Sequence, residues 1–266
     1  MPSLFDLTGK VAVITGSSKG IGKAIALRMA EHGAKVVVSS RKADACELVA
    51  QEIRDAGGDA IVIPCNIGKK EDLQALIDGT VKHYGRLDTL VCNAAVNPYF
   101  GPSEQIPDDA YDRIMNSNVR SNLWLVNMAM PHLKKAAAET GDASVTIVSS
   151  IGGLRGSATL GVYGISKAAD MQLARTLATE HGPLKVRANC IAPGLVKTDF
   201  AKALWEDPVL YKKRTKDSPL LRIGEPDEIA GAAVFLAAPA AGFMTGQTMV
   251  IDGGVTSGVP LSAFDD

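Results

Sequence analysis

Near its N-terminus the chain reads Val11-Ala-Val-Ile-Thr-Gly16-Ser-Ser-Lys-Gly20-Ile-Gly22, a β-branched run followed at once by three closely spaced glycines. A helical pattern of apolar residues begins directly after the turn. Gly16 suits the tight turn, Gly20 lets backbone approach a pyrophosphate, and Gly22 allows the helix to pack closely on the strand. Because helix N-termini attract anions, the turn is predicted to bind phosphate. The residues assigned to this site are Gly16, Ser18, Lys19, Gly20, Ile21 and Gly22.

The same alternation of strand and helix patterns continues along the chain. Seven short apolar runs predict strands that are buried on both faces, at residues 11–15, 35–39, 60–64, 87–92, 144–149, 186–192 and 248–252. Helix-length amphipathic stretches lie between them, at residues 21–32, 43–56, 70–84 and 111–135. This alternation predicts a parallel sheet with right-handed crossovers. Since no repeat or linker divides the pattern, we expect one α/β domain over residues 1–266 with a doubly wound seven-stranded sheet.

Composition narrows the classes of partner. The 266 residues are 46% hydrophobic and 21% charged, which is enough apolar material for one large core. A formal net charge of -1 gives no overall field that would hold nucleic acid or an anionic membrane. We therefore expect a small-molecule partner, with neither nucleic acid nor membrane bound.

Cysteine usage and the N-terminal residues predict the compartment. The four cysteines lie far apart and form no CxxC motif or Cys/His cluster of metal-ligand spacing, namely Cys46, Cys65, Cys92 and Cys190. We expect reduced core thiols and no bound metal. The first ten residues contain no apolar leader segment, and no later stretch is long enough to span a bilayer. These observations favour a reducing cytoplasm.

The second strand ends in Ser39-Ser40-Arg41-Lys42, where enzymes that use NAD carry an acidic residue for the ribose 2′-hydroxyl. A carboxylate there would repel the 2′-phosphate of NADP, whereas the Arg41 guanidinium can bind it with paired donors. Ser40 can add a hydroxyl, and Lys19 in the glycine turn supplies a second cation. The predicted cofactor is therefore NADP(H).

A second cluster of chemically useful side chains lies later in the chain. Tyr163 and Lys167 are four residues apart on a predicted helix and so share one face. An ammonium close to the phenol favours the phenolate, which makes Tyr163 a candidate acid or base. Ser150 stands thirteen positions before Tyr163, at the carboxyl end of a predicted strand, where open α/β sheets build their sites.

The spacings Gly-x3-Gly-x-Gly and Ser-x12-Tyr-x3-Lys resemble those of the short-chain dehydrogenase/reductase family, whose members have a Rossmann fold. The resemblance implies that Ser150 binds the substrate oxygen and that Tyr163 exchanges a proton with it. It also implies that Lys167 holds the nicotinamide ribose, and that Asn118 holds a water linking Lys167 to solvent. Two neighbours, Ser149 and Asn116, are alternatives for Ser150 and Asn118, although the family spacing favours the latter pair.

Further cofactor contacts follow from the same resemblance. Asn66 and Ile67 come after the third strand, where Asn66 replaces the Asp that commonly meets the adenine amino group. Asn93 and Ala94 belong to an Asn-Ala-Ala element that resembles the family's Asn-Ala-Gly turn near adenine and ribose; a purely structural turn explains Asn93 nearly as well. The segment after the sixth strand implies nicotinamide contacts from Pro193, Gly194, Val196 and Thr198.

Local motifs resemble the NADP-dependent carbonyl and retinal reductases of the family, which implies a hydrophobic ketone or aldehyde substrate. A 3-oxoacyl-carrier-protein reductase and a non-catalytic NADP-binding protein are the alternatives. The sequence Gly164-Ile-Ser-Lys-Ala168 resembles the nucleophile elbow of hydrolases, but it lacks the second glycine, and no downstream acid and His complete a persuasive catalytic triad.

Residues 199–218 interrupt the alternation of strand and helix patterns and predict either a substrate lid or a solvated helix pair. The family also implies a homotetramer that pairs the helices at residues 111–135 and 160–181.

Overall fold

The computed structural model describes residues 3–258 and 260. Within them the sheet has seven strands, all parallel, in the order β3-β2-β1-β4-β5-β6-β7. The strands are β1 Val11–Thr15, β2 Lys35–Ser39, β3 Asp59–Val62, β4 Thr89–Cys92, β5 Ala143–Val148, β6 Val186–Pro193 and β7 Thr248–Ile251. This confirms the expected doubly wound α/β fold. The winding direction reverses between β1 and β4, which is where ligands bind in open sheets of this kind.

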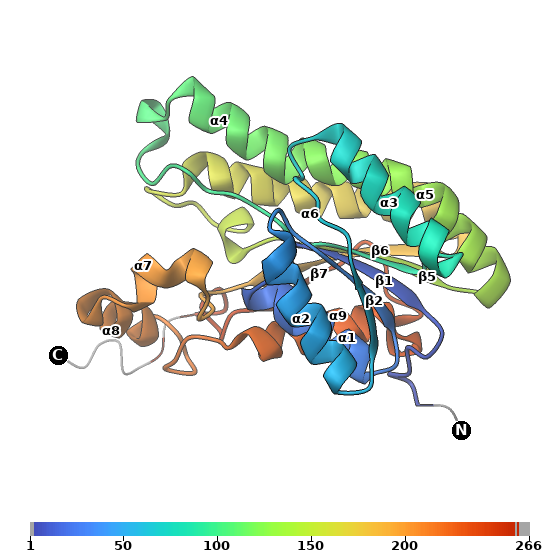
Figure 1. Cartoon of the computed structure of the whole chain (residues 1–266). Coiled ribbons are helices and arrows are strands. Elements are labelled where there is room, and N and C mark those ends of the chain that lie inside the picture. The colour runs from blue at the N-terminus through green and yellow to red at the C-terminus, as the bar shows by residue number, and fades with distance from the viewer. Residues whose placement is uncertain (1–2, 259, 261–266) are drawn as a thin grey trace.

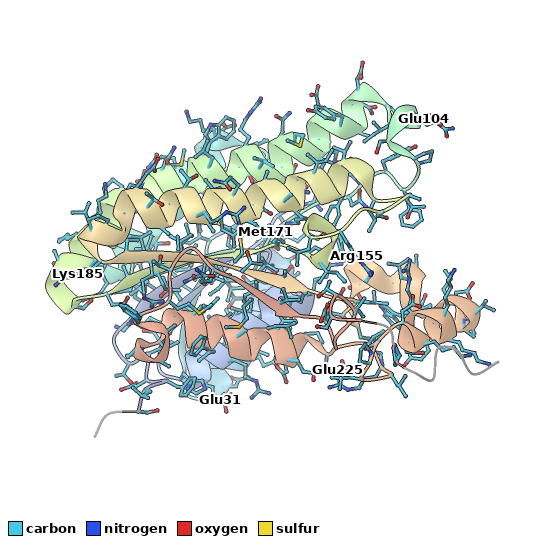
Figure 2. The ribbon with its side chains drawn as sticks, turned by 180° about the vertical axis from the view of Figure 1, so that it is seen from behind. Glu31, Glu104, Arg155, Met171, Lys185 and Glu225 are labelled. Carbon is cyan, nitrogen blue, oxygen red and sulfur yellow. The ribbon has the colours of Figure 1, made fainter. Side chains whose placement is uncertain are left out.

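Helices cover both faces of the sheet (Figure 1). One face packs against α1 Gly20–Glu31, α2 Ala43–Asp55 and α9 Pro226–Ala237, and the other against α3 Lys70–Tyr84, α5 Ser121–Thr140 and α6 Gly161–His181. Successive strand residues alternate between these two cores, as Val13 and Ile14 do. Figure 2 shows Met171 pointing from α6 toward the sheet, where it is buried.

The helix expected over residues 111–135 is longer and is interrupted. It consists of α4 Asp108–Met115, a π-helical turn Asn116–Arg120, and α5. Turns of this kind insert an extra residue into a helix and frequently lie at functional sites. Here the turn carries Asn118, so the interruption falls at a predicted site residue. The hydrophobic pattern alone did not reveal it.

Residues 199–218 form a separate extension. A short 3₁₀ turn, Asp199–Ala201, leads into α7 Lys202–Trp205 and α8 Pro208–Lys216, which project from one end of the layered body (Figure 1). No residue of α8 is buried, and Asp207 caps the helix by accepting hydrogen bonds from its first backbone N–H groups. The Trp205 indole donates to the Thr198 carbonyl at 2.9 Å, which ties α7 to the base of the extension.

The cysteines occupy the interior, as the sequence predicted. Cys46, Cys65, Cys92 and Cys190 are buried and carry free thiols. Burial raises the pKa of Cys65 to about 12, so its thiol stays neutral at ordinary pH. Among the described helices, none combines the length and the apolar character needed to cross a bilayer.

Candidate functional site

The glycine turn after β1 has the geometry that its sequence requires. Gly16 and Gly20 have φ of 68° and 56°, in the left-handed region that favours glycine. A Cβ on Gly22 would lie 2.4 Å from the Gly16 carbonyl oxygen, so α1 and the turn approach closely there only because Gly22 lacks a side chain. Gly16 and Gly20 are therefore favoured by the backbone conformation of the turn, and Gly22 by the lack of space for a side chain.

The N-terminus of α1 is open to an anion. The residue before the helix, Lys19, makes no side-chain cap, and the first turn contains no acidic residue. Its leading N–H groups lack the intrahelical partners that later residues have, and the helix dipole adds positive potential. Ser17, which sequence reasoning did not assign, donates to the Ile14 carbonyl at 2.7 Å and accepts from the Ser39 N–H at 2.8 Å. It thereby fixes the turn to the end of β2.

The residues predicted to bind the 2′-phosphate lie at the edge of this turn. Ser40 is half-buried, with its hydroxyl 3.1 Å from the Cys46 sulfur, and Arg41 is exposed. Lys19 is also exposed and pairs with Asp199 of the extension at 3.1 Å. The cation of the glycine turn is therefore paired with a residue of the segment 199–218, which the sequence predicted to be either a substrate lid or a solvated helix pair.

Asn93 supports the glycine turn directly. Its side-chain amide donates to the Thr15 and Gly16 carbonyls at 2.8 and 3.3 Å, and the Ala94 N–H donates to the Thr15 hydroxyl at 3.1 Å. These contacts give Asn93 the structural role that the sequence analysis had left open. The Asn66 side-chain oxygen accepts from the Gly68 N–H at 3.1 Å, which closes a local turn beside half-buried Ile67.

Ser150 lies directly after β5 with a half-buried hydroxyl, which accepts from the Gly152 N–H at 3.1 Å. Its neighbour Ser149 is buried and donates to the Lys167 carbonyl at 2.7 Å, so Ser149 holds β5 against α6. The Ser149 hydroxyl is thus engaged in a buried backbone contact, whereas Ser150, the residue with the predicted spacing, is half-buried.

Close packing at glycines brings Ser150 toward Tyr163. A Cβ on Gly153 would lie 2.7 Å from the Lys167 backbone, and one on Gly164 would lie 2.7 Å from the Gly152 carbonyl oxygen. A Cβ on Gly152 would stand 3.4 Å from the Ser150 hydroxyl and 3.9 Å from the Tyr163 ring. Sequence reasoning did not assign this packing role to the glycines, although the Gly152-Gly153 pair stands two residues after Ser150.

The Lys167 ammonium is buried beside Tyr163. It lies 5.8 Å from the centre of the Tyr163 ring and donates to the Val148 carbonyl at 3.0 Å and to Asp170 Oδ2 at 2.9 Å. Burial is the largest influence and opposes the charged ammonium, but Asp170, Tyr163 and Cys190 together outweigh it and raise the pKa of Lys167. The predicted Tyr163/Lys167 proximity is present, together with an acidic partner that was not predicted.

Asn118, rather than half-buried Asn116, points inward from the π-helical turn and is fully buried. Its side chain accepts from the Val96 N–H at 2.9 Å and donates to the Val96 carbonyl at 3.0 Å and to the Ser166 hydroxyl at 3.1 Å. Ser166 is also fully buried, so it does not resemble the exposed nucleophile of a hydrolase elbow.

The segment after β6 touches both halves of the site. Pro193 ends the strand, Gly194 packs against Asp252, and Val196 pairs with Gly224 in an isolated bridge. A Cβ on Gly20 would lie 3.2 Å from the Thr198 methyl group. Asp199 pairs with Lys19, and the Phe200 ring lies 6.3 Å from the Tyr163 ring between centroids. Three consecutive residues, 198–200, thus contact the glycine turn and Tyr163.

Known proteins share this arrangement. The family model described as enoyl-(acyl carrier protein) reductase matches residues 16–256. The chain is 39% identical over 251 residues to dehydrogenase/reductase SDR family member 4 of Bos taurus, which covers 94% of this chain and 88% of that protein. A gluconate 5-dehydrogenase from Burkholderia cenocepacia J2315 in complex with NADP and tartrate is 30% identical, with a TM-score of 0.90 over 96% of this chain and 98% of that one.

A 7α-hydroxysteroid dehydrogenase complexed with NADH and 7-oxo glycochenodeoxycholic acid is 35% identical, with the same TM-score and coverage. The matches span the glycine turn, the sheet and the segment that carries Ser150, Tyr163 and Lys167. The chain therefore belongs to the short-chain dehydrogenase/reductase family of oxidoreductases.

Proposed function

We propose that this protein transfers a hydride between NADP(H) and a carbonyl or alcohol, with hydrophobic ketones and aldehydes as its substrates, as in the carbonyl and retinal reductases. The observation that carries the proposal is the segment 198–200, which contacts the glycine turn through Thr198 and Asp199 and Tyr163 through Phe200. A dinucleotide bound along this segment would be held by α1 at its phosphates and by the surroundings of Tyr163 at its nicotinamide.

The residues at the cofactor end suit NADP(H). The uncapped N-terminus of α1 suits a pyrophosphate, and close packing at Gly16, Gly20 and Gly22 holds the backbone of the turn against that N-terminus. Arg41, Ser40 and Lys19 provide donors for a 2′-phosphate, and no carboxylate of β2 opposes it. One similar structure is described with NADP and another with NADH, so the proposed preference for NADP(H) over NAD(H) rests on the side chains of this chain.

The remaining roles follow from the chemistry of the side chains. When bound, the nicotinamide supplies the hydride that reduces the carbonyl carbon. The Ser150 hydroxyl donates to the substrate oxygen and holds it beside Tyr163, whose hydroxyl gives the proton that completes the alcohol. Lys167 stabilises the phenolate that remains, and Asn118 fixes the Val96 backbone at the wall of the pocket. Pro193, Gly194, Val196 and Thr198 would hold the nicotinamide.

A substrate panel tests the function. Purified protein is mixed with NADPH and, separately, with aromatic ketones, long-chain aldehydes, hydrophilic sugars and acetoacetyl thioesters, and absorbance at 340 nm is followed. We expect the highest kcat/KM with the ketones and aldehydes. Highest activity with the thioesters would favour the acyl-carrier-protein alternative, for which exposed Lys212 and Lys213 and half-buried Arg214 of α8 supply cations. NADPH binding without turnover of any compound would favour a non-catalytic role.

Cofactor preference gives a sharper prediction. Arg41→Ala is expected to weaken NADPH binding about tenfold or more while leaving NADH binding unchanged, because only NADPH carries the phosphate that the guanidinium binds. Dissociation constants are measured by quenching of protein fluorescence. Arg175→Ala, an exposed arginine on α6, is the control and should change neither constant. Unchanged NADPH affinity in Arg41→Ala, or tighter NADH than NADPH binding by the wild type, would contradict the assignment.

We also propose that the protein is a homotetramer. α5 and α6 lie side by side on one face of the molecule (Figure 1), and each exposes an apolar side chain, Leu123 and Ile165. Pairing of such faces across a two-fold axis would bury them. Light scattering is expected to give about four times the chain mass of 27.8 kDa. A stable monomer at micromolar concentration would contradict this proposal.

A further inference from the structure

A buried carboxylate, Asp170, lies next to the proposed active site. Asp170 is one turn beyond Lys167 on α6 and is fully buried, as is nearly all of Lys167. Asp170 Oδ2 accepts a hydrogen bond from the Lys167 ammonium at 2.9 Å. A buried charge without a partner is strongly unfavourable. The Lys167 ammonium therefore depends on Asp170 to remain charged in this interior position.

Asp170 is itself held from the opposite side. The Asn122 side-chain amide on α5 donates to Asp170 Oδ1 at 3.0 Å and to the Asn118 carbonyl at 2.7 Å. A continuous chain of protein hydrogen bonds thus runs from Lys167 through Asp170 and Asn122 to the π-helical turn. Because one amide reaches both acceptors, the turn that presents Asn118 and the carboxylate that binds Lys167 are fixed relative to each other.

The groups around the ion pair are otherwise neutral or aromatic. In the described part of the chain, the titratable side chains facing it are Cys92 on β4, Cys190 on β6 and Tyr163 on α6. Burial raises the pKa of both thiols, so they carry no charge, and the Cys190 thiol donates to the Asp170 carbonyl at 3.3 Å. Exposed Arg175 also acts on Cys190 from the solvent side. Asp170 is thus the acidic counter-charge for Lys167.

We propose that Asp170 is a positioning residue that keeps Lys167 charged and next to Tyr163, so that Tyr163 can exchange its proton in the working pH range. This inference rests on the proposed function, in which Tyr163 is the acid or base. Burial raises the pKa of Asp170, while Lys167 and Asn122 hold it down. Without the carboxylate, burial would favour the neutral amine at Lys167 and remove the charge that stabilises the phenolate.

The test replaces the carboxylate with an amide. In Asp170→Asn, the pH midpoint of alcohol oxidation with NADP is expected to rise by about one unit, which lowers the rate near neutral pH about tenfold and restores it at higher pH. A readout without turnover follows phenolate absorbance near 295 nm as the difference between each protein and its Tyr163→Phe counterpart. The ionisation midpoint from this titration should rise by the same amount.

The matched control is Asp88→Asn. Asp88 is equally buried and pairs with Arg86 at 2.6 Å, but it lies at the amino ends of β1 and β4, away from Tyr163. This variant should lose thermal stability while both midpoints stay at their wild-type values. Asp170→Ser, which is smaller, provides a second charge-removing variant if the amide packs poorly.

Each outcome decides one question. An unchanged or lowered midpoint in the Asp170 variants, or an equal shift in Asp88→Asn, would overturn the proposal. A wild-type protein that turns over no carbonyl or alcohol would instead contradict the proposed function. The absorbance titration would still decide the role of Asp170 in that case, because it requires neither cofactor nor substrate.

Discussion

Tyr163→Phe is expected to slow hydride transfer about a thousandfold, because the substrate oxygen then has no proton donor or acceptor. The ring should keep its place, since the contact with Phe200 involves the ring and not the hydroxyl. NADPH affinity should persist, because the glycine turn and Arg41 do not need the phenol. Single-turnover rates and NADPH dissociation constants, measured on the same preparations, separate the two effects.

Tyr84→Phe is the control for this substitution. The Tyr84 hydroxyl at the end of α3 donates to Asp59 at 2.8 Å, so the change removes a bonded phenol outside the proposed site. It should leave the rate unchanged. Near-normal turnover in Tyr163→Phe would contradict the mechanism. Loss of NADPH affinity in step with the rate would instead assign the hydroxyl to cofactor binding.

Gly22→Ala is expected to be the most damaging of the conservative substitutions at the cofactor end. The added Cβ would lie 2.4 Å from the Gly16 carbonyl oxygen and 2.5 Å from the Asn93 amide nitrogen, and these two groups are themselves hydrogen-bonded. The turn must therefore open or α1 must move away from it. We expect a loss of about 3 kcal/mol in the free energy of unfolding and an NADPH affinity at least tenfold weaker.

Gly231→Ala provides a matched comparison. Gly231 also lies within a helix, α9, but a Cβ there meets nothing within 4 Å. Alanine should be neutral or stabilise the protein by about 0.5 kcal/mol, because it favours the helix. Denaturant unfolding and NADPH titration of both variants measure these effects. Equal stability of the two alanine variants would show that the turn is not constrained at Gly22.

The sequence predicted the features that depend on local patterns. Apolar runs marked all seven strands, with ends displaced by only a residue or two. Burial on both faces was expected for all of them, but the edge strands β3 and β7 are only partly buried because each has a neighbour on one side alone. The glycine turn and the Tyr163/Lys167 pair were found because each is fixed by spacing within a single element. Ser149 and Ser150 were distinguished by spacing alone; in the structure Ser149 donates to the Lys167 carbonyl, and the role of Ser150 stays a prediction.

Other features depend on contacts between distant segments and leave no local pattern. Asp170 reads as an ordinary polar residue of α6 until Asn122, 48 positions earlier, is brought against it. The π-helical turn at Asn118 preserves the general hydrophobic pattern of a helix, so periodicity predicted an uninterrupted one. The packing of Gly153 on α6 is likewise a tertiary constraint.

The three residues at the base of the extension limit how the chain can diversify. In many α/β proteins, loops are exchanged during evolution without disturbing the scaffold. Here Thr198 lies against Gly20, Asp199 pairs with Lys19, and Phe200 lies against Tyr163, so the loop and the scaffold share an attachment point. If the proposed site is right, a grafted extension that alters these three residues is expected also to alter retention of the dinucleotide. Viable grafts therefore begin after Phe200, which leaves α7 and α8 free to vary.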